Sequence, residues 1–163
     1  MSSKSELLAL INSANGTAYT EAEISFDAPA VIEGAAAGQP NSNVTVHGQA
    51  AAGYTGQQTF AYKRLDLESV FSAVTLVAHG PRTNASVADI LDDIATQTGV
   101  VIPAEDMVAE TVDFLQSSYT LKADAGSFKW VGQVTVQLVV DLVDIEPTLQ
   151  TTTLSGFDAP VLA

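Results

Sequence analysis

The sequence predicts an α+β fold: an internally duplicated helix-plus-antiparallel-strands unit, followed by an extended C-terminal arm. Three observations support this: two helical patterns that each end at a glycine, strand patterns after each helix, and a pair of matching strand motifs. The predicted boundaries are 1–78 for the first unit, 79–146 for the second and 147–163 for the arm. A repeat of this kind decides the whole fold assignment.

The duplication is clearest in the run that begins at Trp130. Residues 130–136, WVGQVTV, match residues 54–60, YTGQQTF, in an aromatic residue, a Gly-Gln pair, a threonine and a final apolar residue. Upstream, residues 6–24 match residues 89–107 without a gap, including the glycine that ends each helical pattern. We therefore expect two equivalent halves whose backbones superpose.

The first unit is expected to open with a helix over 4–15. Ser3 and Glu6 have the spacing of a capping box, and apolar residues then recur at helical intervals until Gly16, which is suited to the left-handed conformation after a helix. Thr20 and Glu23 form a second capping box. Strands are expected over 24–28, 44–46, 56–62 and 74–77, with a turn at 79–81.

The second unit repeats this order. A helix is expected over 86–98, capped by Asn84 or Ser86 and ended by Gly99, and Pro103 is suited to the first turn of a further helical segment. Strands are expected over 119–123 and 134–142, and the second shows the clearest alternation of the chain. Its apolar side chains should share one face, covered by the helix; they are Val134, Val136, Leu138 and Val140 against Ile90, Leu91 and Ile94.

Composition narrows the classes of function. Of 163 residues, 47% are hydrophobic and 15% charged, so the chain can bury a core. A net charge of −13 opposes nucleic-acid backbones and anionic membrane surfaces, so neither is expected as a partner. There is no cysteine, which removes disulfides and thiolate chemistry. The sequence shows neither a secretion signal nor an apolar run long enough for a membrane span, so we do not expect passage through the general secretory route.

The candidate chemical residues do not assemble into a catalytic pattern, and we expect no enzyme, cofactor or metal. His47 and His79 are the only imidazoles, and no nucleophile motif accompanies them. An acidic cluster on the second helix is expected to be a solvated face; it comprises Asp89, Asp92 and Asp93. A calcium site or a small metal-dependent hydrolase could use Asp141, Asp144 and Glu146, although their spacing does not match an EF-hand loop.

The order of several segments resembles small virion structural proteins of tailed bacteriophages. The segments are LLALINSANGTAYTEAEISF, VTVHGQAAAGYTGQQTFAYKRLDL, the second helix and the TTTLSGF tail. The resemblance implies a non-enzymatic capsid- or tail-associated subunit, present in many copies and located in the virion. Its implied partners are copies of itself and other virion proteins. The resemblance transfers no catalytic residue and does not distinguish head, neck, tail and baseplate.

The C-terminal arm supplies the candidate interface residues. Residues 147–163 lack a basic residue and show neither helical nor sustained strand periodicity, so they are poor independent folders. Thr151–Leu154 has the β-branched content to add a strand to an exposed sheet edge. The interface candidates are Leu154, Phe157, Val161 and Leu162.

An alternative function is a receptor- or glycan-binding module of a virion or cell surface. Its support is the pair Tyr54 and Trp130, which could stack on a sugar, and the small-residue loop over 33–43. Because the two aromatic residues occupy matched repeat positions, core or interface anchors are the competing interpretation. Exposed aromatic side chains in a groove would favour the binding module.

Overall fold

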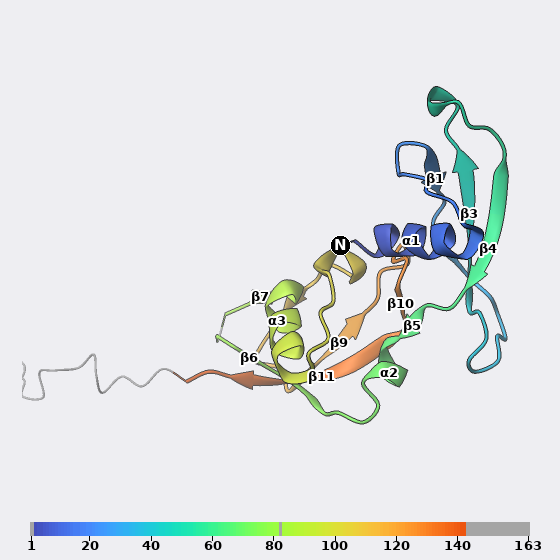
Figure 1. Cartoon of the computed structure of the whole chain (residues 1–163). Coiled ribbons are helices and arrows are strands. Elements are labelled where there is room, and N and C mark those ends of the chain that lie inside the picture. The colour runs from blue at the N-terminus through green and yellow to red at the C-terminus, as the bar shows by residue number, and fades with distance from the viewer. Residues whose placement is uncertain (1, 82, 143–163) are drawn as a thin grey trace, which may run out of the picture.

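The computed structural model describes residues 2–81 and 83–142, and it has the predicted α+β class. The chain forms two lobes, each with one long helix beside a β-sheet (Figure 1). We call them lobe 1, built on residues 2–62, and lobe 2, built on residues 65–142. Two short parallel strands join them, β5 (Leu65–Asp66) and β10 (Trp130–Val131).

Lobe 1 is a helix on a fully antiparallel sheet. The central strand β3 (Ser42–Gly48) is flanked on one side by β1 (Ile24–Phe26) and β2 (Ala30–Val31), and on the other by β4 (Gln57–Tyr62). A short 3₁₀ turn, η1 (Ala50–Ala52), lies between β3 and β4. Helix α1 (Ser3–Asn15) covers one face, and the core contains Leu7, Leu8, Ile11, Ile24, Val44 and Val46.

The first turn of α1 differs by one residue from the predicted capping box. Ser2 is the N-cap, and its hydroxyl accepts a hydrogen bond from the Ser5 N–H. Ser3 is instead the first helical residue and is buried, because its hydroxyl is used in a contact with lobe 2. Gly16 ends the helix at φ 64°, the left-handed conformation that glycine adopts without a steric penalty.

Lobe 2 contains a mixed sheet in place of the predicted antiparallel one. Its central strand β11 (Gln133–Val140) pairs antiparallel with β9 (Ser118–Lys122) and parallel with β6 (Leu76–Gly80). Helix α3 (Val87–Thr98) packs against it. The remaining elements are α2 (Leu67–Val70), β7 (Ala85–Ser86), η2 (Ala104–Asp106) and β8 (Thr111–Val112).

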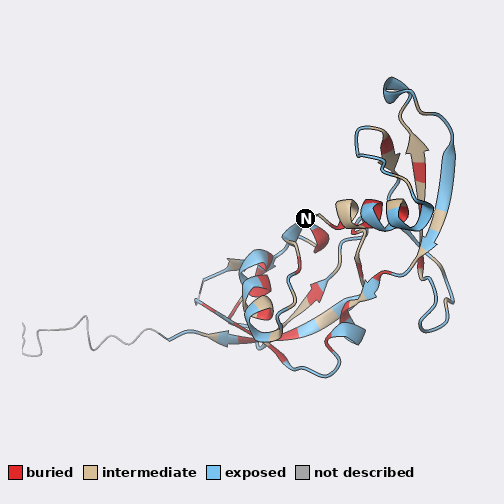
Figure 2. Cartoon of the chain, in the orientation of Figure 1, coloured by how far each residue is buried: buried red, intermediate tan, exposed pale blue. Residues whose placement is uncertain are grey.

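The face predicted for β11 is confirmed. Val136 and Leu138 are buried in the same core as Ile90, Leu91 and Ile94, and Val134 and Val140 pack against its margin. Figure 2 shows the buried residues of α3 on the side that meets the sheet. The cap is also confirmed, because Ser86 and Asp89 form a full capping box at the start of α3.

Lobe 2 differs from the sequence-based expectation at three points. The turn expected at 79–81 is strand up to Gly80, which lies against the Phe114 ring; a Cβ there would meet Phe114 Cζ at 2.6 Å. Pro103 precedes η2 as its N-cap and is not its first helical residue. The unit boundary expected after residue 78 also differs from the packing, since Leu67, Phe71 and Leu76 belong to the core of lobe 2.

The structure does not show the predicted duplication as a whole. The two halves differ in strand order, because β11 carries the parallel strand β6 on one edge whereas β4 pairs only with β3 among the described residues. Some local features do match: each long helix ends at a left-handed glycine, and an antiparallel strand pair follows each. The predicted arm at 147–163 lies outside the described residues.

Candidate functional site

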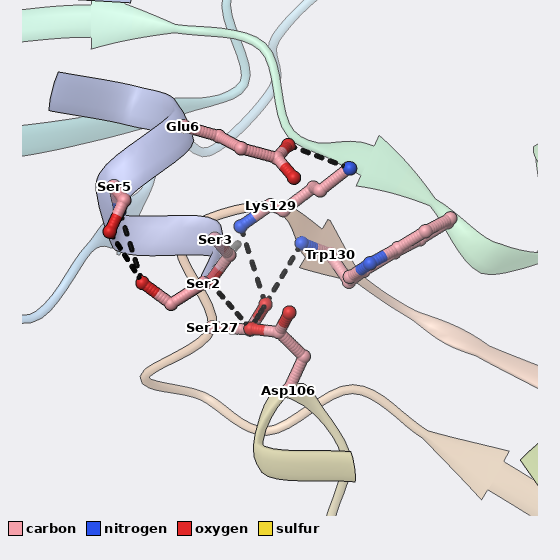
Figure 3. Close-up of polar contacts among 8 residues, drawn as sticks. All are labelled: Ser2, Ser3, Ser5, Glu6, Asp106, Ser127, Lys129 and Trp130. Carbon is pink, nitrogen blue, oxygen red and sulfur yellow. Dashed lines mark hydrogen bonds and ion pairs between the residues drawn. The ribbon is translucent and has the colours of Figure 1, made fainter. Parts of the chain in front are cut away.

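The most buried polar cluster lies where the two lobes meet. Asp106, at the end of η2, is 2% exposed, and its Oδ1 accepts hydrogen bonds from Ser3 Oγ at 2.7 Å and Ser127 Oγ at 2.8 Å (Figure 3). Ser3 belongs to the first turn of α1, and Ser127 precedes β10. One carboxylate therefore connects the helix of lobe 1 to two segments of lobe 2.

Ser127 extends this cluster into the backbone. Its Oγ also accepts hydrogen bonds from the N–H groups of Trp130 at 3.0 Å and Lys129 at 3.3 Å. The Lys129 side chain turns to the rim, where Nζ lies 2.7 Å from Glu6 Oε2 (Figure 3). The Trp130 indole is 1% exposed and stacks on Phe71, with ring centroids 6.5 Å apart.

Arg64 crosses the same junction. Its Nε donates to Ser42 Oγ at 2.6 Å and its Nη1 donates to the carbonyl oxygen of Ser127 at 3.0 Å. The side chain is buried, and this desolvation lowers the pKa of the guanidinium from its usual value. Both oxygens that it contacts are neutral, so Arg64 acts here as a fixed hydrogen-bond donor between lobes.

The arrangement suits a structural joint better than a reaction centre. Both serine hydroxyls donate to the same oxygen of Asp106, and neither histidine of the chain contacts the cluster. Asp106 Oδ2 and Trp130 Nε1 are buried without a hydrogen-bond partner in the described part of the chain. The start of α1 lies beside the carboxylate, and the positive end of a helix dipole stabilises such a charge.

A second feature is an open groove on lobe 1 with a volume of about 300 Å³, which we call the tyrosine groove. Tyr19 and Tyr54 meet there edge to face, with centroids 5.5 Å apart. The Tyr54 hydroxyl donates to Glu23 Oε1 at 3.0 Å, and this bond raises the pKa of Tyr54. Further residues around the groove are Ile11, Ile24, Val46, Gln58 and Phe60.

Tyr54 and Trp130 do not form the sugar-stacking pair considered for the alternative function. Tyr54 lines the tyrosine groove of lobe 1, whereas Trp130 is buried in the core of lobe 2. Trp130 thus has the anchoring role that was the competing interpretation. The aromatic partner of Tyr54 is Tyr19, which the repeat motif did not single out.

The two histidines lie in different lobes and each contacts a separate acid. His47 Nε2 lies 2.9 Å from Asp27 Oδ2, and His79 Nδ1 lies 3.4 Å from Asp141 Oδ1. Serine and histidine are not brought together by either contact. The geometry therefore provides no nucleophile–base pair at these two positions.

Asp89 and Asp92 are exposed, as expected for a solvated face, and Asp89 and Asp93 also hold local structure. Asp89 caps α3 through Ser86, and the Ser86 N–H and hydroxyl lower its pKa; Asp93 accepts from the His79 N–H at 2.6 Å. Asp141 is described, whereas Asp144 and Glu146 lie outside the described residues. No group of three potential metal ligands occurs within residues 2–81 and 83–142.

The four interface candidates, Leu154, Phe157, Val161 and Leu162, also lie outside the described residues. Sequence reasoning missed the joint made by Asp106, Ser127 and Arg64. The available signal was slight: Asp106 aligns with Glu23 in the two matched segments, and nothing in the sequence shows that one of these acids is buried. Among the described helices, none is long and apolar enough to cross a membrane.

Comparison with known proteins gives one match, which covers residues 1–163 and is described as Family of unknown function (DUF7941). The chain belongs to this family. No curated protein matches the chain. No solved structure matches it either. Family membership thus places the chain without assigning it a reaction, ligand or partner.

Proposed function

We propose that this chain is a non-enzymatic structural subunit of a bacteriophage virion, present in many copies and packed against itself and other capsid or tail proteins. The observation that carries the proposal is the exposed apolar end of lobe 2. Leu142, just beyond β11, is 81% exposed, Leu115 is 64% exposed and Val139 is 40% exposed. Val139 and Leu142 lie at the end of β11, and Leu115 precedes β9, the antiparallel partner of β11. Contiguous exposed apolar surface marks interaction sites.

The position of this surface strengthens the proposal. Residues 143–163 continue the chain directly from it, and they include the apolar residues Leu154, Phe157 and Leu162. With a net charge of −13, subunits repel one another, so apolar contacts or basic neighbours are needed to bring them together.

The direct test is to purify phage particles from cells that produce this chain and to measure its copy number by mass spectrometry. The expected result is a fixed copy number that persists through density-gradient purification. A chain that remains wholly in the unassembled fraction contradicts the proposal.

A receptor- or glycan-binding module is the second candidate, and the tyrosine groove favours it. Tyr19 and Tyr54 present an aromatic edge and a hydroxyl in an open groove, which is a chemistry suited to stacking on a sugar ring. Tyr19→Ala should then abolish retention on an immobilised glycan array, with Tyr119→Ala in lobe 2 as the matched control. Equal retention of both variants, or none by the wild type, removes this candidate.

A further inference from the structure

Strand β4 has a free edge on the side away from β3. Strand β4 is exposed over much of its length (Figure 2), and β3 is its only strand partner among the described residues. Its sequence, QQTFAY, has no charge and no proline. Sheet edges are normally protected from pairing by such residues, by bulges or by a covering segment. An unprotected edge of this length suits an added strand.

The hydrogen-bonding alternation shows which groups of β4 face outward. The Gly48 N–H donates to the Gly56 carbonyl, so Gly56 directs its backbone groups toward β3. In an antiparallel pair this direction alternates, so the backbone groups of Gln58, Phe60 and Tyr62 also point toward β3. The backbone N–H and C=O groups of the alternate residues point away from β3. These residues are Gln57, Thr59 and Ala61.

Lobe 2 shows what occupies the equivalent edge. The bond from the Gly48 N–H to the Gly56 carbonyl corresponds to one from Ala123 to Gly132, and both are 3.0 Å. The bond from the Gln49 N–H to the Glu23 carbonyl corresponds to one from Asp124 to Asp106, and both are 2.8 Å. These bonds place β4 in the position of β11. The free edge of β4 thus corresponds to the edge of β11 that pairs with the parallel strand β6.

The helices support the same correspondence. In lobe 2, α3 holds the backbone of β6 through Asp93 and Gln97, which accept from the His79 and Val77 N–H groups. In the matched segments, the corresponding residues of α1 are Leu10 and Ala14. Both are exposed, Leu10 to 65%, and Leu10 shares a hollow of about 220 Å³ with Tyr62 of β4.

We propose that the β4 edge binds residues 148–155 of a second copy of this chain as an added parallel strand. The exposed side chain of Leu10 would lie under this added strand. This inference rests on the proposed assembly function and names its contact. The segment Thr148–Ser155, TLQTTTLS, is uncharged and rich in β-branched residues, so it brings no repulsion to an uncharged edge.

The segment 148–155 cannot reach the β4 edge of its own chain, so a second copy is required. A strand parallel to β4 starts at its Gln57 end, at the tip of lobe 1, whereas β11 points away from lobe 1 (Figure 1). To bind its own β4, the segment would first have to return along β11, which at ~3.3 Å per residue is about 26 Å long. It would then have to run along β4 to the Gln57 end. Residues 143–148 extend over at most about 22 Å. The contact is therefore between chains.

The geometry of this contact is head to tail. The donor segment begins at the far end of lobe 2 and the acceptor lies on lobe 1, so one copy can donate and accept at once. Such heterologous contacts close into rings or continue as filaments. Two copies that exchange their segments would form a closed dimer, and donation around more copies would form a ring or tube.

The first experiment measures self-association of full-length variants by analytical ultracentrifugation at physiological salt. Ala61→Pro removes an outward N–H donor, while the matched control Ala61→Val keeps it. Wild type and Ala61→Val should form dimers or larger species as concentration rises, and Ala61→Pro should remain monomeric. Association by Ala61→Pro equal to that of Ala61→Val, or a wild type that is monomeric at every concentration, overturns the proposal.

A second variant covers the case in which Ala61→Pro does not fold. Leu10→Asp places a charge under the added strand at an exposed position and should also give a monomer with an unchanged melting temperature. Val101→Asp, at an exposed apolar residue of lobe 2, is its control and should associate normally. Equal association of these two variants contradicts the assigned edge.

Crosslinking then identifies the occupant, because the chain has no native cysteine. An acceptor chain carries Ala61→Cys and Thr152→Pro, and a donor chain carries Ala61→Pro and Thr152→Cys. A short bis-maleimide should join donor to acceptor in the mixture. Absence of this product, or a link confined to one chain in an Ala61→Cys, Thr152→Cys double variant, overturns the proposal.

The two proposals fail separately. Equal copy numbers of Ala61→Pro and Ala61→Val in purified particles would reject the strand contact and leave the virion role intact. Self-association through the β4 edge by a chain that is absent from particles would keep the contact and reject the virion role.

Discussion

Lobe 1 and lobe 2 use similar local patterns to build cores of different size. In the described residues, the core of lobe 2 contains 16 buried hydrophobic residues and that of lobe 1 contains six. The difference follows from β6 and α2, which close lobe 2, whereas β4 of lobe 1 keeps a free edge. One lobe therefore provides most of the apolar stabilisation, and the other presents backbone to the outside.

The largest expected effect breaks the core of lobe 2. Leu138→Asp places a carboxylate among buried apolar side chains and loses roughly 1.5–3 kcal/mol of side-chain burial in addition to the cost of desolvating the charge. The variant should be insoluble or lack a cooperative thermal transition. Leu142→Asp, at an exposed position, is the control and should melt like the wild type. A soluble, cooperatively melting Leu138→Asp protein would show that the face of β11 is misassigned.

The next test compares how much the two cores contribute to the free energy of unfolding. Ile90 of α3 is 0% exposed in the large core, and Leu7, its counterpart in α1, is 4% exposed in the small one. Large-to-small core substitutions cost about 2–5 kcal/mol, and less where neighbours are few. Urea unfolding should show a greater loss for Ile90→Ala than for Leu7→Ala. The reverse order would contradict the view that lobe 2 dominates stability.

The third test separates the lobes at Asp106. Asp106→Ala leaves the Ser3 and Ser127 hydroxyls without their acceptor, and a buried polar group left unpaired costs about 1–3 kcal/mol. Calorimetry should show one transition in the wild type and broadening or splitting in the variant. Asp106→Asn retains an acceptor oxygen and should show the smaller change. Equal behaviour of both variants would assign the stabilisation to charge and not to these hydrogen bonds.

A weaker effect comes from acid at the surface of lobe 1. The Thr20 N–H and hydroxyl, with the Tyr54 hydroxyl, lower the pKa of Glu23 below its ordinary value of 4.5. Glu23 therefore contributes stability that is complete above pH 4.5 and is lost as the pH falls through its lower folded-state pKa. The melting temperature of Glu23→Gln should fall less steeply over that range than that of the wild type. Parallel curves would contradict the assignment.

The smallest effect is expected from the arm. Within the described residues, the buried core of both lobes lies between Leu7 and Leu138, so deleting residues 148–163 should change the free energy of unfolding by only about 0.5 kcal/mol. Thermal melting measures this, and loss of the self-association seen in the full chain should accompany it. A truncated chain that no longer folds would make the arm part of the domain.

Local patterns predicted the elements well, and long-range pairing poorly. Gly16 and Gly99 end the two helices as expected, and the alternation from Val134 to Val140 identified the buried face of β11. These features depend on residues a few positions apart. The parallel pairing of β6 with β11 leaves no local trace, because its partners are distant in sequence and His79-Gly80-Pro81 has the composition of a turn.

The candidate site was harder to predict for a similar reason. Asp106 becomes a joint only because Ser3 and Ser127 arrive from opposite ends of the chain. The composition around each of these residues is ordinary. Tyr54 and Trp130 occupy matched positions in the sequence motif, but Tyr54 lines the tyrosine groove and Trp130 is buried in the core of lobe 2, so the motif alone did not predict their different surroundings.

The parallel pair of β6 and β11 also sets an order of folding. Leu76 pairs with Val136, so about 60 residues must be enclosed before this ladder forms, whereas β3 and β4 are joined by a short hairpin. Non-local pairing slows folding, and on a ribosome β11 emerges after all the other described strands. Lobe 1 can thus fold during synthesis while lobe 2 waits for β11. The arm is synthesised immediately afterwards, so the donor segment becomes available last, when the acceptor edge of the same chain is already formed.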